Sequence, residues 1–124
     1  MSEAPRPLRG QVFHVDIEGV GPHYWLVVSN NRRNAHLHDV LVVQVTSTPP
    51  RSPRASYVPL MKGHDSFEGW VKCDGIGPMN RDRLGQAKGA LSPPSMRRVD
   101  VGLASALGLE ALGLEALGLR GRSG

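Results

Sequence analysis

The side chains best suited to chemistry in this sequence are a histidine, two threonines and a set of arginines. His23 precedes an apolar segment, and Thr46 and Thr48 end another. Histidine can give or take a proton near neutral pH, and a hydroxyl can donate a hydrogen bond to a developing anion. The arginines in the segments that follow are Arg32, Arg33, Arg51 and Arg54. A proton carrier, hydroxyl donors and cations together suit phosphate chemistry that needs no metal ion.

Signals for other kinds of site are weak. His36 and His38 form an H-x-H pair beside Asp39, but they fall in a polar connection and the sequence offers no third ligand near them. The lone cysteine, Cys73, is expected to be a buried small hydrophobic side chain rather than a nucleophile. No glycine-rich phosphate loop and no Gly-x-Ser-x-Gly nucleophile motif is present in the sequence. We therefore expect neither a metal site nor a cofactor.

The composition bounds the class of protein. The 124 residues fit one domain, and an apolar fraction of 40% excludes a disordered chain. The net charge is +4, with basic clusters in residues 31–60 and 76–100, which suits a polyanionic partner such as nucleic acid. The sequence has no apolar run of membrane-spanning length and no signal peptide, and its single cysteine cannot form an internal disulfide. We expect a protein of the reducing cytoplasm that has no membrane partner.

Short strands must position these side chains. Residues 11–17 alternate, with Phe13, Val15 and Ile17 predicted on one face. The further predicted strands are residues 24–29, 39–48, 56–60, 69–73 and 86–91. Residues 18–22 and 49–54 are predicted loops because glycine and proline break a strand, and residues 30–38 are predicted to be a polar connection.

A helix is predicted at the end of the domain. Ser92 can cap it, Pro93 suits its first position, apolar residues recur at intervals of three or four, and Gly108 can close it. A shorter turn is expected after Asn80. Closely spaced strands with one terminal helix predict a mainly β protein, a compact barrel against which the helix packs.

The ends of the chain differ from the rest. Residues 1–8 are predicted to be a flexible leader, and residues 9–109 the folded domain. Residues 110–124 continue an ALGLE repeat that begins at Ala106, and we expect a low-complexity tail.

Seven segments, in order, resemble the MazF/PemK toxin family. They are Arg9-Gly10-Gln11-Val12 with Val15-Asp16; Leu26-Val27-Val28-Ser29-Asn30; Val45-Thr46-Ser47-Thr48; Val71-Lys72-Cys73-Asp74-Gly75-Ile76; Arg83-Leu84; Leu91-Ser92; and Met96-Arg97-Arg98-Val99-Asp100 with Ala106-Leu107-Gly108-Leu109. Each piece is weak alone, but their order over residues 9–109 is specific.

The resemblance implies a small SH3-like barrel of the CcdB/PemK type, a homodimer and an antitoxin partner. It also implies a metal-independent endoribonuclease that cuts single-stranded RNA at selected sequences, with attack by the 2′-hydroxyl and a 2′,3′-cyclic phosphate end. The family's catalytic pair is an arginine three residues before the L-V-V-S motif and the threonine of the third-strand motif. By that count His23 takes the place of the arginine and Thr46 that of the threonine.

This chain departs from the family at two places. His23-Tyr24 stands where the family usually has Arg-Pro, so a proton carrier replaces a fixed cation. Arg32, Arg51 or Arg54 could then supply the missing charge. Gly75 stands where glutamine is common.

The predicted RNA contacts are the aromatic Tyr24, a stacking candidate, the hydroxyl of Thr48 and the basic side chains of Arg32, Arg33, Arg51 and Arg54. Two alternatives stay open, because one fold can carry several functions. One is a non-catalytic gyrase inhibitor of the CcdB type, and the other is an RNA-binding barrel that does not cleave.

Overall fold

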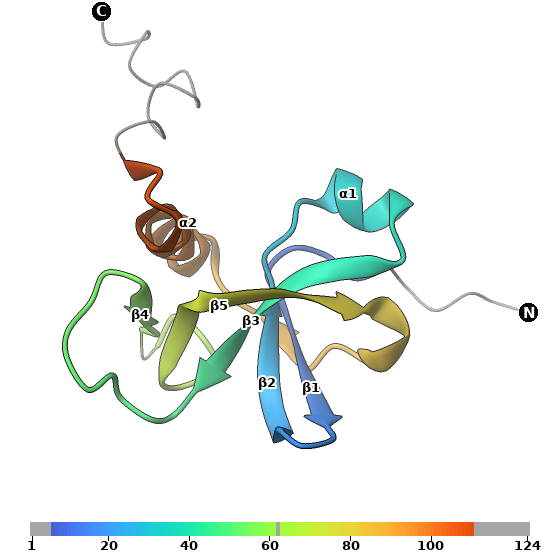
Figure 1. The fold of residues 1–124 in the computed structure, drawn as a ribbon, viewed down its shortest axis with the longest axis horizontal. Helices are drawn as coiled ribbons and strands as arrows, with labels where there is room; N and C mark the ends of the chain where they lie inside the picture. The colour runs from blue at the N-terminus through green and yellow to red at the C-terminus, as the bar shows by residue number, and fades with distance from the viewer. Residues whose placement is uncertain (1–5, 62, 111–124) are drawn as a thin grey trace, which may run out of the picture.

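A computed structural model describes residues 6–61 and 63–110. The elements in chain order are β1 (Gln11–Ile17), β2 (Gly21–Val27), α1 (Asn31–His36), β3 (Asp39–Thr46), β4 (Tyr57–Pro59), β5 (Trp70–Asn80), the 3-10 turn η1 (Arg81–Arg83), β6 (Gly89–Ala90) and α2 (Pro93–Leu107). The six strands form one antiparallel sheet in the order β4-β5-β3-β2-β1-β6. The sheet curls, with α2 beside β4 and β5 and with α1 at the other side of the molecule (Figure 1). This architecture confirms the prediction of a mainly β fold with a C-terminal helix.

The two faces of the sheet bury separate apolar clusters. The cluster between the sheet and α2 contains Val12, Leu26, Val43, Val45, Val58, Val71, Cys73, Met96 and Val99. The cluster on the opposite face contains Phe13, Val15, Val27, Val40, Val42, Met79 and Leu84. The alternation predicted in β1 is confirmed, since Phe13 and Val15 are buried, Ile17 packs against the same cluster, and the residues between them are exposed.

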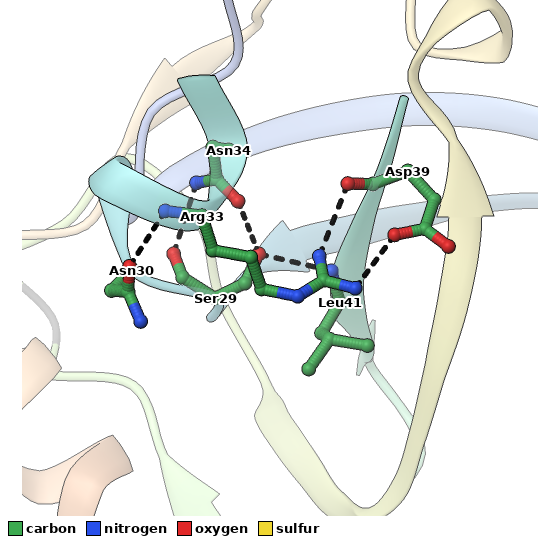
Figure 2. Close-up of polar contacts among 6 residues, drawn as sticks. All are labelled: Ser29, Asn30, Arg33, Asn34, Asp39 and Leu41. Atoms are coloured by element: carbon green, nitrogen blue, oxygen red, sulfur yellow. Dashed lines mark hydrogen bonds and ion pairs between the residues drawn. The ribbon is translucent and has the colours of Figure 1, made fainter. Parts of the chain in front are cut away.

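Helix α1 corrects the prediction of an irregular connection over residues 30–38. The side chain of Asn30 caps the helix by accepting a hydrogen bond from the amide of Arg33 at 2.8 Å. Asn34 is fully buried, accepts from the hydroxyl of Ser29 at 2.5 Å and donates to its carbonyl at 3.0 Å. The same hydroxyl accepts the amide of Leu41 on β3 at 3.0 Å, so α1 is fastened to the sheet by polar contacts rather than by an apolar face (Figure 2).

Strand β5 also differs from the prediction. The strand predicted over residues 69–73 continues to Asn80: Gly75 lies in an irregular stretch between Lys72 and Gly77, and Gly77 and Pro78 pair with Val42 and Leu41 of β3. The pairing between β3 and β5 shifts register between Val42 and Gln44. At the other edge, the strand predicted over residues 86–91 shrinks to Gly89–Ala90.

The terminal helix has the predicted limits. The side chain of Ser92 accepts from the amide of Ser95 at 3.3 Å, and a proline stands in the first turn. Gly108 ends the helix in the left-handed conformation with φ of 73°. Arg9 ties this end of the domain to the sheet, since its guanidinium donates to the carbonyl of Val28 at 3.0 Å and pairs with Asp100 on α2.

The predicted chain ends are only partly described. Residues 1–5 of the leader and 111–124 of the tail lie outside the described residues, so the three domain boundaries stay predictions. None of the helices in the described part of the chain has the length and apolar character needed to span a membrane.

Candidate active site

His23 and Thr46 face each other across neighbouring strands. Strand β2 pairs with β3 in a register that places Tyr24 opposite Val45. Continuing that antiparallel register by one residue brings His23 opposite Thr46, the last residue of β3. Directly opposed residues on one face of a sheet have Cβ atoms about 4.5–5.5 Å apart. The structure therefore brings together the two residues that the sequence predicts as the catalytic pair.

Hydrogen bonds hold the ring of His23. Its Nε2 lies 3.1 Å from the carbonyl oxygen of Val20, in the turn between β1 and β2. Because a carbonyl only accepts, Nε2 carries the hydrogen. Its Nδ1 lies 3.1 Å from the amide nitrogen of Gln44, which donates to the lone pair of the neutral ring. The Trp25 ring meets His23 edge-on, with ring centroids 6.4 Å apart. The environment selects one tautomer of a neutral imidazole.

Thr46 is oriented by the turn that follows β3. Its hydroxyl oxygen accepts a hydrogen bond from the backbone amide of Thr48 at 3.1 Å. The hydroxyl still has its own hydrogen to donate. The bond inside this short turn fixes the oxygen beside the site, and the hydrogen is available to a phosphate oxygen.

A basic hollow of about 480 Å³ opens on one side of this pair. Besides His23, Thr46 and Thr48, its lining residues are Gln44, Pro49, Pro50, Arg51, Arg54, Tyr57 and Lys72. The guanidinium of Arg54 lies 5.6 Å from the centre of the Tyr57 ring and 3.6 Å from the carboxylate of Asp74. The predicted arginines of residues 49–54 thus lie next to His23 and Thr46, together with a lysine from β5.

An aromatic hollow of about 600 Å³ opens on the other side of the same pair. It shares His23, Thr46 and Thr48 with the basic hollow, and its remaining lining residues are His14, Pro22, Tyr24, Val45, Ser47, Ser66, Phe67 and Glu68. Tyr24 packs edge-on between His14 and Phe67, with centroid distances of 5.0 and 5.6 Å. Since successive side chains of a strand point to opposite faces, Tyr24 lies on the other face of β2 from His23.

Gly69 sets the distance between the aromatic hollow's wall and β3. Its φ of 111° is one that residues with a side chain rarely adopt, and a Cβ atom there would overlap the carbonyl oxygen of Thr46. The carbonyl of Gly69 accepts from the amide of Leu60 at 2.8 Å. Only a glycine lets the segment that carries Phe67 and Glu68 approach β3 so closely.

Two of the predicted RNA contacts lie elsewhere. Arg32 and Arg33 belong to α1, which precedes the start of β3, whereas Thr46 ends that strand. Eight residues of strand put the two ends about 23 Å apart. The guanidinium of Arg33 donates to the carboxylate of Asp39 at 2.7 Å and to its backbone carbonyl at 3.1 Å (Figure 2). Neither arginine lines the aromatic or the basic hollow.

The histidine pair of residues 36 and 38 is not gathered into a site. His36 Nδ1 contacts the carbonyl of Arg32 at 2.8 Å, while His38 Nε2 lies 2.8 Å from the carboxylate of Asp82. Among residues 6–61 and 63–110, no three His, Cys, Asp or Glu side chains lie close enough together to hold a metal ion.

Cys73 has the predicted role of a buried small side chain. It is fully buried against α2, and its thiol lies 3.9 Å from the carbonyl of Val99. Burial, reinforced by the nearby carboxylates of Asp74 and Asp100, raises the pKa of the Cys73 thiol to about 12. A thiol that holds its proton so firmly is a poor nucleophile.

Gln44 is the main site residue that the sequence analysis did not identify. It is the one polar side chain between Val40 and Val45 in a strand that is otherwise apolar there, and it lies two residues before Thr46, on the same face. A single amide within an apolar run next to a predicted catalytic residue was the available signal. No sequence pattern marked Lys72 or Glu68 as a site residue. Lys72 lies on β5 and Glu68 in the loop before it, and only the folded chain brings these segments next to β3.

The chain resembles known proteins over most of its length. Residues 8–107 match the family described as the PemK-like, MazF-like toxin of type II toxin–antitoxin systems. The endoribonuclease MazF4 of Mycobacterium tuberculosis is 42% identical over 103 residues, covering 83% of this chain and 94% of the relative.

Solved structures agree with this match. An endoribonuclease from mycobacterial species, solved in complex with its cognate antitoxin, superposes with a TM-score of 0.74 at 40% identity and covers 83% of this chain and 96% of that one. A second mycobacterial endoribonuclease gives a TM-score of 0.76 at 37% identity, with coverage of 88% and 98%. The chain belongs to the PemK-like, MazF-like toxin family of type II toxin–antitoxin systems.

Proposed function

We propose that this toxin is a metal-independent endoribonuclease that cuts single-stranded RNA at selected sequences, with His23 and Thr46 as its catalytic residues. The observation that carries the proposal is the placement of a tautomer-fixed imidazole opposite a threonine hydroxyl, at the edge of a hollow lined by Arg51, Arg54 and Lys72. The relatives named as endoribonucleases support the reaction class.

The chemistry needs one proton to move twice. Once the Gln44 amide nitrogen turns away from it, Nδ1 of neutral His23 takes the proton of the ribose 2′-hydroxyl as the 2′-oxygen attacks the adjacent phosphorus. The bond from phosphorus to the 5′-oxygen breaks, and the imidazolium returns the proton to that leaving oxygen. The products are a 2′,3′-cyclic phosphate and a 5′-hydroxyl end, so atoms and charge balance without water or a metal ion.

The neighbours of His23 support both protonation states. Gln44 can present its amide nitrogen to the neutral ring or, after rotation, its amide oxygen to the imidazolium. Thr46 donates to a non-bridging phosphate oxygen, and the cations of the basic hollow hold the negative charge that grows on the phosphate. This division of labour replaces the fixed cation of the family's arginine by a proton carrier with separate cations beside it.

The remaining RNA contacts belong to the same proposal. Tyr24 stacks on a base and Thr48 contacts a phosphate near the scissile bond. Arg32 and Arg33 could touch RNA only where it extends toward α1, at the opposite end of β3 from the catalytic pair.

The family membership supports two protein partners. We infer a homodimer whose groove receives RNA and, in competition, acidic and apolar segments of a cognate antitoxin. A structural relative solved with its cognate antitoxin supports this inference. The expected compartment is the cytoplasm, where its RNA substrate and its antitoxin would be found.

One assay tests the proposed activity. Purified protein is incubated with a long single-stranded RNA in the presence of a chelator, and the ends of the fragments are mapped. We expect discrete cuts with cyclic phosphate ends. RNA binding without cuts would replace the proposal by a non-catalytic RNA-binding barrel, and neither binding nor cuts would direct attention to inhibition of gyrase.

A further inference from the structure

The aromatic hollow has a chemistry of its own. The described residues that line it include no lysine or arginine, whereas three basic side chains, Arg51, Arg54 and Lys72, line the basic hollow. The acidic residue Glu68 is among the residues that line the aromatic hollow. A phosphate would be repelled there, so an RNA that crosses the catalytic pair must place a different part of a nucleotide in this hollow.

Tyr24 provides a fixed platform inside the hollow. Tyr24 as a residue is 41% exposed, and edge-on contacts with His14 and Phe67 hold its ring. Unpaired bases stack on exposed aromatic rings of this kind. The volume of about 600 Å³ lies within the usual range for small-ligand clefts, so a base has room to enter.

Glu68 and the nearby hydroxyls decide which base fits. A carboxylate accepts hydrogen bonds at both oxygens, which favours an edge with two adjacent N–H donors. Guanine presents such an edge through N1–H and N2–H, next to an O6 acceptor that a serine can serve. Ser66 and Ser47 line the same hollow. Cytosine and adenine each offer one amino group, and uracil flanks its single N–H by two carbonyls that a carboxylate repels.

We propose that the aromatic hollow binds an unpaired guanine base of the RNA, stacked on Tyr24 and hydrogen-bonded by Glu68. The guanine belongs to a nucleotide next to the scissile phosphate, because His23 and Thr46 line this hollow as well as the basic one. The inference rests on the proposed function and adds a sequence requirement to it. The close approach of Gly69 to Thr46 keeps the distance between the recognised base and the cut constant.

The first measurement is the cleavage consensus. Wild-type protein is incubated with a randomised RNA library, and the sequences at the cut ends are read. We expect guanine to dominate at one position within two nucleotides of the cut. For Glu68→Gln we expect that position alone to lose its preference, while the remaining consensus stays. A wild-type consensus without guanine next to the cut overturns the inference.

The second measurement identifies the hydrogen bond itself. Short RNAs carry guanine or inosine at the selected position, since inosine lacks only the N2 amino group, and a 2′-deoxy sugar at the scissile site blocks cleavage. The replacement should weaken binding to the wild type about tenfold, the worth of one hydrogen bond to a charged acceptor. Glu68→Gln keeps one uncharged acceptor oxygen, so its preference for guanine over inosine should fall to about threefold or less.

The control variant removes one carboxylate charge at a position outside the aromatic hollow. Asp82 lies in η1, pairs with His38 and lines neither hollow, so Asp82→Asn should keep the full tenfold discrimination. If Glu68→Gln still discriminates as the wild type does, the base is read elsewhere and the inference is wrong.

The outcomes separate the inference from the function on which it rests. If the wild type does not cut RNA, the proposed activity fails, yet binding of short single-stranded RNAs in which each guanine in turn is replaced by inosine still decides on the guanine site. If the wild type cuts but both comparisons show no role for Glu68, the activity stands and the guanine site falls.

Discussion

The aromatic hollow and the basic hollow share only three lining residues: His23 on β2, Thr46 at the end of β3, and Thr48 in the turn after it. They are similar in volume, about 600 and 480 Å³, but opposite in chemistry. One offers aromatic rings and a carboxylate, and the other offers guanidinium and ammonium groups. RNA has the same two sides, its bases and its charged backbone, and the proposed catalytic residues His23 and Thr46 lie where the two hollows meet.

The difference follows from the geometry of a sheet. Tyr24 and His23 are adjacent in sequence, yet they point to opposite faces of β2 because side chains alternate along a strand. Gln44 and Lys72 pair across β3 and β5 on the basic side, whereas Val45 and Val71 pair on the side of α2. The adjacent residues His23 and Tyr24 can therefore contact the basic and the aromatic hollow on opposite faces of the strand.

The largest expected effect comes from a residue that both hollows share. We expect His23→Ala to lower the rate of RNA cleavage by about 10²–10⁴-fold, because it removes the proton carrier, while the affinity for RNA changes little. Single-turnover cleavage and RNA binding measure the two quantities separately. His36→Ala is the matched control, since His36 is exposed on α1. If His23→Ala cuts RNA at the wild-type rate, His23 is not the proton carrier, and the two hollows do not meet at a catalytic histidine.

A smaller effect is expected at the floor of the basic hollow. Gln44→Leu deletes the donor to Nδ1 of His23, and we expect cleavage to slow by up to about tenfold, the worth of one ordinary hydrogen bond. In ¹⁵N NMR spectra the Nδ1 resonance should move toward that of an unbonded imine nitrogen, while Nε2 stays protonated through Val20.

The exposed Gln86→Leu serves as the control for this change. A loss of activity with an unmoved Nδ1 resonance would mean that Gln44 acts through something other than the imidazole.

The smallest expected effect concerns the phosphate contacts. Arg51→Gln should weaken RNA binding about threefold, equally for all sequences, and should reduce the salt dependence of the binding constant by about 0.7 in slope. With an RNA too short to extend from the two hollows to α1, Arg32→Gln removes the same charge from α1 and should leave that slope unchanged. Binding isotherms at several salt concentrations compare the two. Equal slopes in the two variants would show that cations at both ends of β3 hold the backbone.

Local patterns sufficed to predict much of the fold. The alternation in residues 11–17 and the cap residues Ser92 and Gly108 act through residues that are close in sequence, so a local pattern is enough to predict them. The strand and the helix that they predicted, β1 and α2, were confirmed. Helix α1 was missed because it has no apolar face, and the buried bonds of Asn34 to Ser29 that stabilise it are tertiary contacts. Strand β5 was underestimated because its glycines and proline look like a turn until the bulge in its pairing with β3 is known.

The site was predictable in part for a similar reason. His23 and Thr46 could be named from a resemblance to known motifs, and the register of β2 and β3 brings them together. The two hollows depend on the loops after β3 and before β5. Hydrophobic periodicity predicts strands and helices, but it does not predict the conformation of such loops. Which arginines lie near the pair, and that Glu68 lines the opposite side, therefore emerge only from the folded chain.

The contact between Gly69 and Thr46 has a consequence for how such toxins diversify. Because backbone alone joins the two at that point, substitutions at residues 66–68 alter the wall of the hollow and leave the cutting strand in place. A lineage built in this way acquires a new target sequence by exchanging surface side chains, without rebuilding its catalytic machinery.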